Sequence, residues 1–270
     1  MGMPLVSIIM GLYNNEKTID ECVNSIINQT YPNWELIICN DCSTDGSYKK
    51  AQEIAQRDKR IKLLENEKNS KLAATLNHCL EHAKGQYIAR MDADDTCKPN
   101  RSEKQVNFLN EHAEFDVVGS AADVSDGNVV FEKRITKEVP EKMDLIKGTP
   151  YIHPSIMMRK EAYDKLHGYT VANRTIRGQD LDLWFRFYAN GMKGYNLQES
   201  LITYYEKKED YKKRNFKTAK MYVRTNLFGF RLLQIPLKYY LYAFKPFLSY
   251  LLPNQLLRKY HQHKKLPDRK

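Results

Sequence analysis

The chain has 270 residues, of which 42% are hydrophobic and 28% are charged. This length suits one substantial domain with an appendage, and the apolar fraction excludes an intrinsically disordered protein. The formal net charge of +10 is unevenly distributed, because residues 207–270 carry 17 Lys/Arg against 3 Asp/Glu, whereas the preceding 206 residues are slightly acidic. The sequence therefore predicts a main domain, residues 1–206, followed by a basic tail with a different role, residues 207–270.

The N-terminal segment and the cysteines both indicate the cytoplasm. The segment MGMPLVSIIM lacks the charged start of a secretory signal and leads directly into a strand pattern. The five cysteines are odd in number and lie in or beside regular elements, which favours reduced thiols over a disulfide framework. Cys39 and Cys42 form a C-x-x-C pair, but there is no second pair for a zinc site, so we expect buried structural thiols.

The first 95 residues alternate between strand-like and helix-like patterns. Buried strands are predicted in PLVSIIMGLYN, NWELIICND, RIKLLEN and GQYIARM. The predicted helices are one with apolar positions Ile19, Cys22, Val23, Ile26 and Ile27, one from about Thr44 to Arg57, and one from Lys71 to Ala83. Such alternation specifies an α/β fold, with a parallel sheet covered by helices on both faces. Ligands bind at the carboxyl ends of these strands, so Asn14, Asp41 and Asp92 should meet in one crevice.

After about residue 115 the alternation breaks. The stretch EFDVVGSAADVSDGNVVFEKRI predicts a hairpin with its turn at Asp126, Gly127 and Asn128. HPSIMMR predicts another short strand, and GQDLDLWFRFYANG predicts a helix closed by Gly191. We therefore expect a mixed sheet in this half of the domain, covering one side of the crevice.

The stretch ARMDADD places three carboxylates within four positions, directly after the fourth predicted strand. In an extended segment Asp92 and Asp94 point the same way, so they can face one ligand together. A hard divalent cation, with phosphate oxygens completing its shell, suits this pair. The alternative is a solvated acidic turn that leads into a helix near Pro99, with Asp95 as its cap.

Two further polar stretches carry weaker signals. In NDCSTDGS, Asp41 ends a strand and can accept hydrogen bonds from a base or a ribose, although any strand-to-helix turn uses such residues. In RGQDLDLWFRF, Asp180 and Asp182 begin an apolar helix just after Arg177. The helix dipole alone favours acidic residues there, and the functional interpretation makes one of them a general base for a hydroxyl.

These motifs, in this order, resemble the family-two glycosyltransferases of the GT-A fold. The resemblance runs from VSIIMGLYNNEKT through NDCSTDGS and ARMDADD to HPSIMMRKEAYDKLHGY and RGQDLDLW, covering residues from about 4 to 205. It implies a Rossmann-like mixed sheet with helices on both faces, a nucleotide-sugar-binding half over about 1–115 and an acceptor half over 116–206. It also implies transfer of a sugar from a nucleotide-diphosphate donor to a hydroxyl, with inversion at the anomeric carbon.

The resemblance places donor-binding residues in the first half. Asp41 matches the aspartate that contacts the nucleobase, and Asp92 and Asp94 match the DxD motif, with Asp94 as the main ligand of Mn²⁺ or Mg²⁺ and Asp92 reaching the ribose or the metal. We expect the donor-binding residues to be Leu12, Tyr13, Asn14, Glu16, Asp41, Arg90 and Asp92. Asn40 departs from the family pattern, because it replaces the first aspartate of a usual acidic pair.

In the second half Asp180 matches the catalytic base, and Gln179 departs from the family by replacing the usual glutamate. His153 matches a position near the diphosphate, where a metal or phosphate role competes with that of a polar core histidine. Arg159 or Arg177 could also neutralise the diphosphate. The tentative acceptor or diphosphate residues are His153, Arg177, Gln179, Asp182 and Trp184.

The basic tail mixes Lys and Arg with twelve aromatic residues. Lys238, Lys245, Pro236 and Pro246 interrupt its apolar portion, which is too short for a membrane-spanning helix. Aromatic and leucine faces flanked by lysines suit amphipathic helices on an anionic membrane surface. The alternatives are a helical cap packed on the main domain or a dimer contact, and the oligomeric state is open. Nucleic-acid binding would explain the charge, but no accompanying motif supports it.

The sequence thus predicts an inverting, metal-dependent glycosyltransferase peripheral to the inner face of the cell membrane. The resemblance favours a UDP-sugar donor, with dTDP second, and a saccharide acceptor, carried on polyprenyl diphosphate, in bacterial surface polysaccharide synthesis. A sugar nucleotidyltransferase would need a Gly-rich, basic triphosphate loop where this chain has GLYNNEKT. A non-catalytic sugar- or lipid-binding scaffold is the other alternative, against which Asp92, Asp94 and Asp180 argue.

Overall fold

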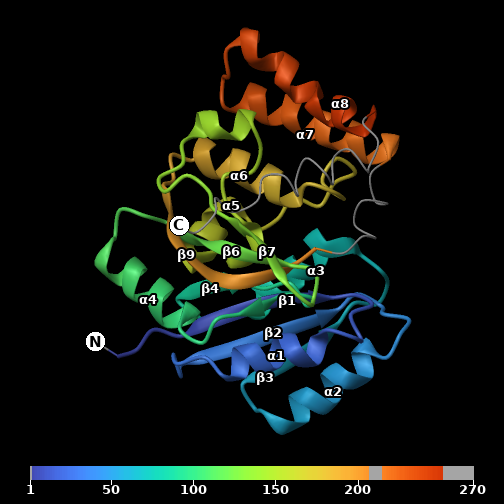
Figure 1. The fold of residues 1–270 in the computed structure, drawn as a ribbon, viewed down its shortest axis with the longest axis vertical. Helices are drawn as coiled ribbons and strands as arrows, with labels where there is room; N and C mark the ends of the chain where they lie inside the picture. Colours follow the sequence, from blue (N-terminus) through green and yellow to red (C-terminus); the bar gives the residue numbers. More distant parts are fainter. Residues whose placement is uncertain (1, 207–214, 252–270) are drawn as a thin grey trace.

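The computed structural model describes residues 2–206 and 215–251, and the parts of the tail prediction that concern 207–214 and 252–270 lie outside these residues. The first half follows the predicted alternation (Figure 1). Its elements are β1 (Val6–Leu12), α1 (Ile19–Ile27), β2 (Trp34–Asn40), α2 (Ser47–Arg57), β3 (Ile61–Glu65), α3 (Lys71–His82) and β4 (Tyr87–Arg90). Helix α2 begins three residues later than expected, because Ser43 and the residues after it form a loop bonded to the segment that follows β1.

The second half is less regular and carries the helices of the tail. Its elements up to residue 206 are β5 (Thr96–Cys97), α4 (Arg101–Glu111), β6 (Val117–Ser125), β7 (Val130–Arg134), η1 (Lys142–Ile146), η2 (His153–Ser155), β8 (Met157–Arg159), α5 (Lys160–Leu166), α6 (Gln179–Ala189) and β9 (Gly194–Tyr205). The described tail contains α7 (Phe216–Leu232), η4 (Leu237–Phe244) and α8 (Lys245–Leu251). The predicted hairpin turn is confirmed, since Asp126 Oδ1 accepts from the backbone N–H groups of Asn128 and Val129.

The strands of the described chain form one nine-stranded sheet in the order β3-β2-β1-β4-β8-β6-β9-β5, with β7 paired to β6. Strands β1 to β4 are parallel, whereas β8 is antiparallel to both β4 and β6, so the mixed sheet is confirmed. Strand β9 was not predicted, and its parallel register with β6 shifts between Ser120 and Ala122. The polar run of Gln198, Glu199 and Ser200 at this irregularity hides the strand pattern in the sequence.

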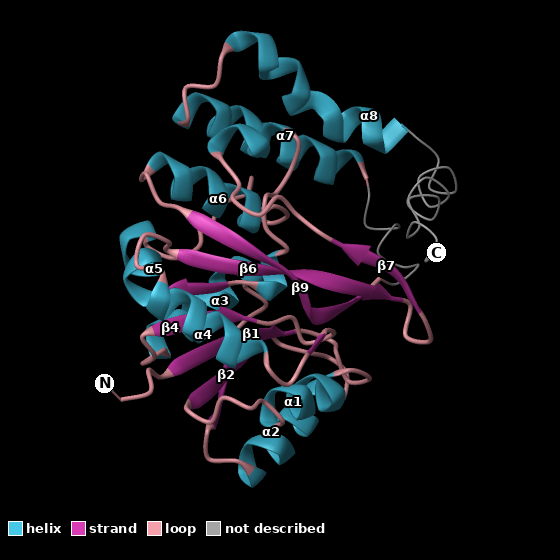
Figure 2. Ribbon diagram, turned by 60° about the vertical axis from the view of Figure 1, so that its left-hand side comes forward, coloured by secondary structure: helices cyan, strands magenta, loops and turns pink. Residues whose placement is uncertain are grey.

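Two apolar layers enclose the sheet because successive strand residues point to opposite faces. On β1, Ile8 and Met10 pack with α1, α2 and α4, whereas Ile9 packs with α3, α5 and α6. Since both faces are covered, every residue of β1 except Gly11 is buried, which explains its continuous apolar pattern. The architecture matches the expected Rossmann-like sheet with helices on both faces (Figures 1 and 2).

The tail helices pack on the outer side of α6, with α7 and α8 as the outermost layer in Figure 2. Gly229 of α7 lies directly against the ring of Phe185 of α6, so the two helices approach closely. Asn226 Nδ2 donates to the carbonyl of Ala243 at 3.3 Å and ties α7 to η4. Among the described residues, no helix has the length and apolar character needed to cross a membrane.

Candidate active site

The strand order places β1 between β2 and β4, so the carboxyl ends that carry Asn14, Asp41 and Asp92 are neighbours. The loop after β1 is bonded to the loop after β2. Asn14, with a left-handed φ of 55°, accepts at Oδ1 from the backbone N–H of Thr44 at 2.8 Å. A Glu16 carboxylate oxygen accepts from the backbone N–H of Gly46 at 3.1 Å. These bonds hold the two loops against each other.

Leu12, the last residue of β1, and Tyr13, which follows it, differ in the exposure of their side chains. The Leu12 side chain is fully buried, so Leu12 can offer a donor only its backbone. Tyr13 is 49% exposed, which leaves its ring free to contact a planar group. The predicted donor-binding role of Leu12 is therefore limited to its backbone groups.

Asp41 caps the start of α3. It is 5% exposed, and its Oδ1 accepts from Asn66 Nδ2 at 2.9 Å and from the N–H of Ser70 at 2.7 Å. Its Oδ2 accepts from the N–H of Lys71 at 3.0 Å, which leaves one lone pair on this oxygen for a ligand. Asn40, the neighbouring departure from the family, donates to Glu65 and accepts from Ser43, so it stabilises the same loop.

Arg90, at the end of β4, is a buried cation beside the DxD motif. Its side chain is 2% exposed and its Nη1 pairs with Asp92 Oδ1, whereas the Asp92 side chain is 31% exposed. Burial lowers the pKa of Arg90, but Asp92, Tyr169 and Asp95 together outweigh this effect, so the pKa is raised above the ordinary value. The guanidinium is therefore permanently charged, and its ion pair with Asp92 fixes the position of that carboxylate.

Asp94 and Asp95 line a pocket of about 200 Å³ together with Glu21 and Tyr205. Asp95 does not cap a helix, as the alternative interpretation had it, because its Oδ1 accepts from the N–H of Tyr205 at 3.0 Å. Burial, reinforced by Asp92 and Asp94, raises the pKa of Asp95 well above its usual range. Burial is the larger cause of this shift, and the contribution of Asp92 and Asp94 shows that neighbouring carboxylates lie close to Asp95.

Within the described ranges no three His, Cys, Asp or Glu side chains are grouped so that they could hold a metal ion by themselves. A hard cation held by Asp92 and Asp94 would have to complete its shell with phosphate oxygens and water. The same finding gives no support to the tentative metal role of His153 beside these two aspartates.

Asp180 lies in the first turn of α6, in a second pocket of about 350 Å³. Gly178, with a φ of 99°, turns the chain into this helix, and Asp180 Oδ1 accepts from the N–H of Leu181 at 2.8 Å. Desolvation raises the pKa of Asp180; the nearby Arg90 opposes this effect and Asp92 adds to it. The Asp180 carboxylate is thus a stronger base than an ordinary aspartate, and the charges of Arg90 and Asp92 both influence its pKa.

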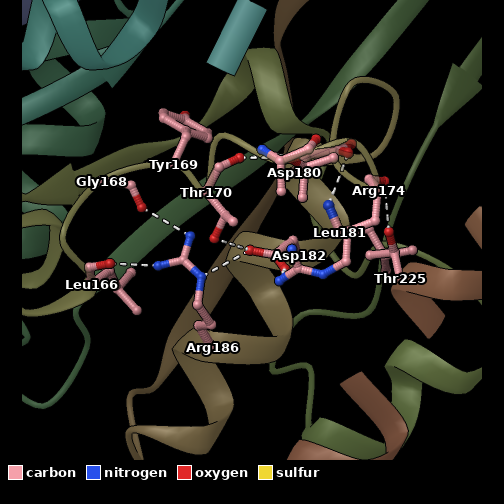
Figure 3. A network of polar contacts seen from close by, with 12 residues as sticks. Leu166, Gly168, Tyr169, Thr170, Arg174, Asp180, Leu181, Asp182, Arg186 and Thr225 are labelled. Carbon is pink, nitrogen blue, oxygen red and sulfur yellow. Dashed lines mark hydrogen bonds and ion pairs between the residues drawn. The ribbon is translucent and has the colours of Figure 1, made fainter. Parts of the chain in front are cut away.

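Asp182 has a structural role instead of the tentative acceptor role (Figure 3). It is fully buried and accepts from Thr170 Oγ1 at 2.6 Å, from Arg174 Nη2 at 2.6 Å and from Arg186 Nε at 2.9 Å. Arg186 also donates to the carbonyls of Leu166 and Gly168. The network joins α6 to the segment after α5 and leaves no accessible oxygen for an acceptor.

Trp184 also needs correction, because it is fully buried with its ring centroid 4.3 Å from that of Tyr151. His153 is 6% exposed, and its Nε2 lies 2.9 Å from the Tyr169 hydroxyl while its Nδ1 has no hydrogen-bond partner. Burial, reinforced by Arg90, keeps the pKa of His153 well below its usual range, so the imidazole is neutral.

The remaining predicted residues differ in accessibility. Gln179 is half-buried at the start of α6, and Arg177 is exposed just before it. Arg159 is not available to a diphosphate, because its guanidinium donates to the carbonyls of Phe115 and Leu109.

The Cys39 thiol is buried and Cys42 donates to the carbonyl of Asn66, as expected for structural thiols.

Sequence reasoning missed the walls of the Asp180 pocket. They come from residues 145–149 and from Tyr222, Asn226, Tyr242 and Lys245 of the tail helices. The mixture of tyrosines and lysines in the tail was visible in the sequence, but no local pattern places these side chains beside Asp180.

Comparisons with known proteins agree with this geometry. The family described as Glycosyl transferase family 2 matches residues 7–177. The chain is 45% identical over 260 residues to the putative glycosyltransferase EpsE of Bacillus subtilis (strain 168), covering 96% of this chain and 94% of EpsE. It is 44% identical over 105 residues to the Escherichia coli UDP-Glc:alpha-D-GlcNAc-diphosphoundecaprenol beta-1,3-glucosyltransferase WfgD, covering 39% of this chain and 41% of WfgD.

Solved structures share the fold at low sequence identity. S. aureus TarS 1-349 in complex with UDP-GlcNAc has a TM-score of 0.68 at 16% identity, covering 92% of this chain and 81% of TarS. The mannosyltransferase PcManGT from Pyrobaculum calidifontis, in complex with GDP-Man and Mn²⁺, has a TM-score of 0.67 at 17% identity, covering 96% of this chain and 80% of PcManGT. The ordered motifs, the mixed sheet and the family match together show that the chain belongs to glycosyl transferase family 2 and has the GT-A fold.

Proposed function

We propose that the protein is an inverting, metal-dependent transferase that moves a sugar from a UDP-sugar to a hydroxyl of a saccharide acceptor. The observation that carries this proposal is Asp180, a carboxyl of raised pKa in a pocket, within the electrostatic influence of Arg90 and Asp92. The base and the proposed diphosphate-binding edge would then act on the same donor and acceptor, as a direct displacement requires.

In the proposed reaction Asp180 accepts the proton of the acceptor hydroxyl as the hydroxyl oxygen attacks the anomeric carbon. The bond between that carbon and the diphosphate oxygen breaks on the opposite face, so UDP leaves and the configuration inverts. The raised pKa of Asp180 makes its carboxylate a stronger base than an ordinary aspartate. Arg90 and its partner Asp92 fix the edge against which the diphosphate lies.

Asp92 and Asp94 would hold the Mn²⁺ or Mg²⁺ that accompanies the donor. When bound, such an ion neutralises charge on the departing diphosphate. Support for a divalent metal comes from the spacing of Asp92 and Asp94 in the sequence and from the Mn²⁺ complex of PcManGT. The two bonded loops after β1 and β2, with Tyr13 exposed on them, would receive the nucleoside.

The relatives support the choice of donor and acceptor. TarS binds UDP-GlcNAc, and WfgD is a glucosyltransferase that uses UDP-Glc and a sugar linked to diphosphoundecaprenol. We therefore propose a UDP-sugar donor, a lipid-linked saccharide acceptor and a role in surface polysaccharide synthesis.

The tail would bring the protein to the inner face of the cell membrane. Several large apolar side chains of η4 and α8 are exposed, among them Leu237 and Leu241 at 81% each and Leu248 at 65%. Lysines 238 and 245 flank them, and the whole segment 207–270 is strongly basic. Apolar side chains flanked by cations match an anionic lipid surface.

The test is a panel of nucleoside diphosphates and UDP-sugars, with and without Mn²⁺, read by melting temperature and by UDP release. A ligand that binds only the native state raises the melting temperature by mass action. Stabilisation by UDP that needs Mn²⁺ and is lost in Asp94→Ala would support the donor site. Asp180→Asn should retain this stabilisation while losing transfer by about a hundredfold or more, as expected for a general base. Stabilisation by no nucleotide would overturn the proposal.

A further inference from the structure

The pocket beside Asp180 is assembled from three segments that are distant in the sequence. Residues 145–149 form one part, the start of α6 a second, and α7, η4 and α8 the third. Its volume of about 350 Å³ is near the lower end of the range of about 300–1,000 Å³ for small-molecule sites. The pocket therefore suits one sugar ring with an attached group better than a long chain of sugars.

Tyr222 of α7 forms the wall next to the base. A Cβ added to Gly178, two residues before Asp180, would lie 3.0 Å from Cε1 of Tyr222, so the ring packs on the turn that presents Asp180. Burial raises the pKa of Tyr222 to about 12, and Asp180 contributes to the shift. The Tyr222 ring is therefore a neutral aromatic surface within the field of the base, and such surfaces suit the apolar face of a sugar ring.

Lys147 and Lys245 give the pocket a cationic part. Both lysines line it and both are exposed, while Asp180 is the one acidic side chain among the described residues that line it. Lys245 Nζ donates to the carbonyl of Lys147 at 3.1 Å, which joins the start of α8 to the 145–149 loop. The ammonium group keeps further donors for an anion, because it carries three N–H bonds.

An apolar surface adjoins this cationic part. Tyr242 lines the pocket and is also 50% exposed, so it extends from the pocket to the molecular surface. Leu241, its chain neighbour, is 81% exposed. A ligand in the pocket thus meets a base and an aromatic ring, two ammonium groups, and then exposed apolar side chains.

We propose that this pocket is the acceptor subsite and that the tail helices recognise the acceptor as an anionic amphiphile, a sugar joined through phosphate to a hydrocarbon chain. Resting on the proposed function, the inference assigns the sugar ring to Tyr222, the phosphate to Lys147 and Lys245, and the chain to Tyr242 and Leu241. Asn226, which also lines the pocket, donates from Nδ2 to the carbonyl of Ala243, so its Oδ1 would be the acceptor for a sugar hydroxyl. The tail is then part of the substrate site as well as a membrane contact.

The experiment compares Lys245→Ala with Lys238→Ala. Lys238 is a matched control, because it is exposed on the adjoining η4 and does not line the pocket. The probe is N-acetylglucosaminyl diphosphate on a short, water-soluble prenyl chain, and its binding is measured by calorimetry on the full chain saturated with UDP and Mn²⁺. The methyl glycoside of the same sugar is the uncharged comparator, and the dissociation constant of UDP is measured separately.

Lys245→Ala should weaken binding of the diphosphate probe about tenfold, the effect of one charge-assisted hydrogen bond, and adding Lys147→Ala should weaken it further. Lys238→Ala should bind the probe like the parent protein, and all variants should bind UDP and the methyl glycoside equally. Lys245→Arg keeps the positive charge and should therefore bind the probe about as well as the parent protein does. Equal probe binding by Lys245→Ala and Lys238→Ala, or no probe binding by a parent protein that binds UDP, would overturn the inference. A parent protein that binds no nucleotide would instead overturn the proposed function.

Discussion

Asp180 and Asp182 are two positions apart in one helical turn, yet the fold uses them in opposite ways. Residues two apart on an α-helix point about 200° apart, so when one faces a pocket the other faces the core. Asp180 lines the pocket, whereas Asp182 binds Arg174 and Arg186 inside the protein. The sequence shows two equivalent carboxylates, and only the packing of α6 distinguishes them.

The buried position of Asp182 predicts a large loss of stability in Asp182→Ala. The substitution leaves Arg174 and Arg186, which are 21% and 18% exposed, without their anion. Removing one partner of a buried ion pair costs about 3–5 kcal/mol. Chemical denaturation should show this decrease in the free energy of unfolding. The exposed pair of Lys160 and Asp164 is the control, since Asp164→Ala should change stability by less than about 1 kcal/mol.

The raised pKa of Asp180 predicts an unusual dependence on pH. Transfer needs the ionised carboxylate of Asp180. As the pH is lowered, the rate should therefore begin to fall at a pH above the ordinary aspartate pKa of about 4. A pH profile of kcat/KM measures this, and an acid limb at the ordinary value would contradict it.

The same shift has a consequence for stability. The pKa of Asp180 is higher in the native state than in the unfolded state. The free energy of unfolding therefore decreases as the pH rises from the unfolded-state pKa to the native-state pKa, and it stays lower at all higher pH values. Asp180→Asn should therefore melt at a higher temperature than the parent at pH 8, and the difference should vanish below about pH 4, the ordinary value. A variant of unchanged stability at pH 8 would show that burial of this charge is not destabilising.

At the scale of elements, strong local patterns were predictable and long-range pairings were not. Strands β1 and β2 are largely apolar because helices cover both faces, and their alternation with amphipathic helices was sufficient to predict the parallel sheet. Strand β9 pairs with β6, far away in the sequence, and its polar interruption resembles a loop. The walls of the Asp180 pocket depend on where α7 lies, which no local pattern encodes.

The close approach of α7 to α6 predicts the effect of Gly229→Ala. A methyl group there would overlap the Phe185 ring, so α7 must move away from α6. Overpacking of this kind costs about 1–3 kcal/mol. Since α7 carries Tyr222 and Asn226, transfer should decrease while the affinity for UDP stays unchanged, as measured by acceptor kinetics and calorimetry. Arg224→Ala, an exposed substitution on the same helix, is the control, and loss of UDP affinity in Gly229→Ala would contradict the separation of the two subsites.

At the scale of the whole molecule, the distribution of charge predicts reversible binding to anionic vesicles. Residues 207–270 carry 17 Lys/Arg against 3 Asp/Glu, and each basic side chain near an anionic surface contributes about 1 kcal/mol. The protein should sediment with vesicles containing phosphatidylglycerol, release at high salt and ignore neutral vesicles. Leu237→Ser with Leu241→Ser should weaken this binding, whereas Val129→Ser with Val130→Ser, in another exposed apolar patch, should not. Equal binding to neutral vesicles would contradict the electrostatic contribution.

The bond between Asp95 and Tyr205 has a consequence for biosynthesis. The acidic loop next to β4 is held by the last strand of the sheet, since β5 pairs with β9 and Tyr205 satisfies a buried carboxyl oxygen. A nascent chain that has emerged only to residue 195 contains every predicted donor contact but lacks this support. Such a chain, released from the ribosome, should fail to bind UDP and Mn²⁺ in calorimetry, whereas residues 1–251 should bind them. Unfinished copies would then consume no activated sugar, because donor use begins only when β9 has been made.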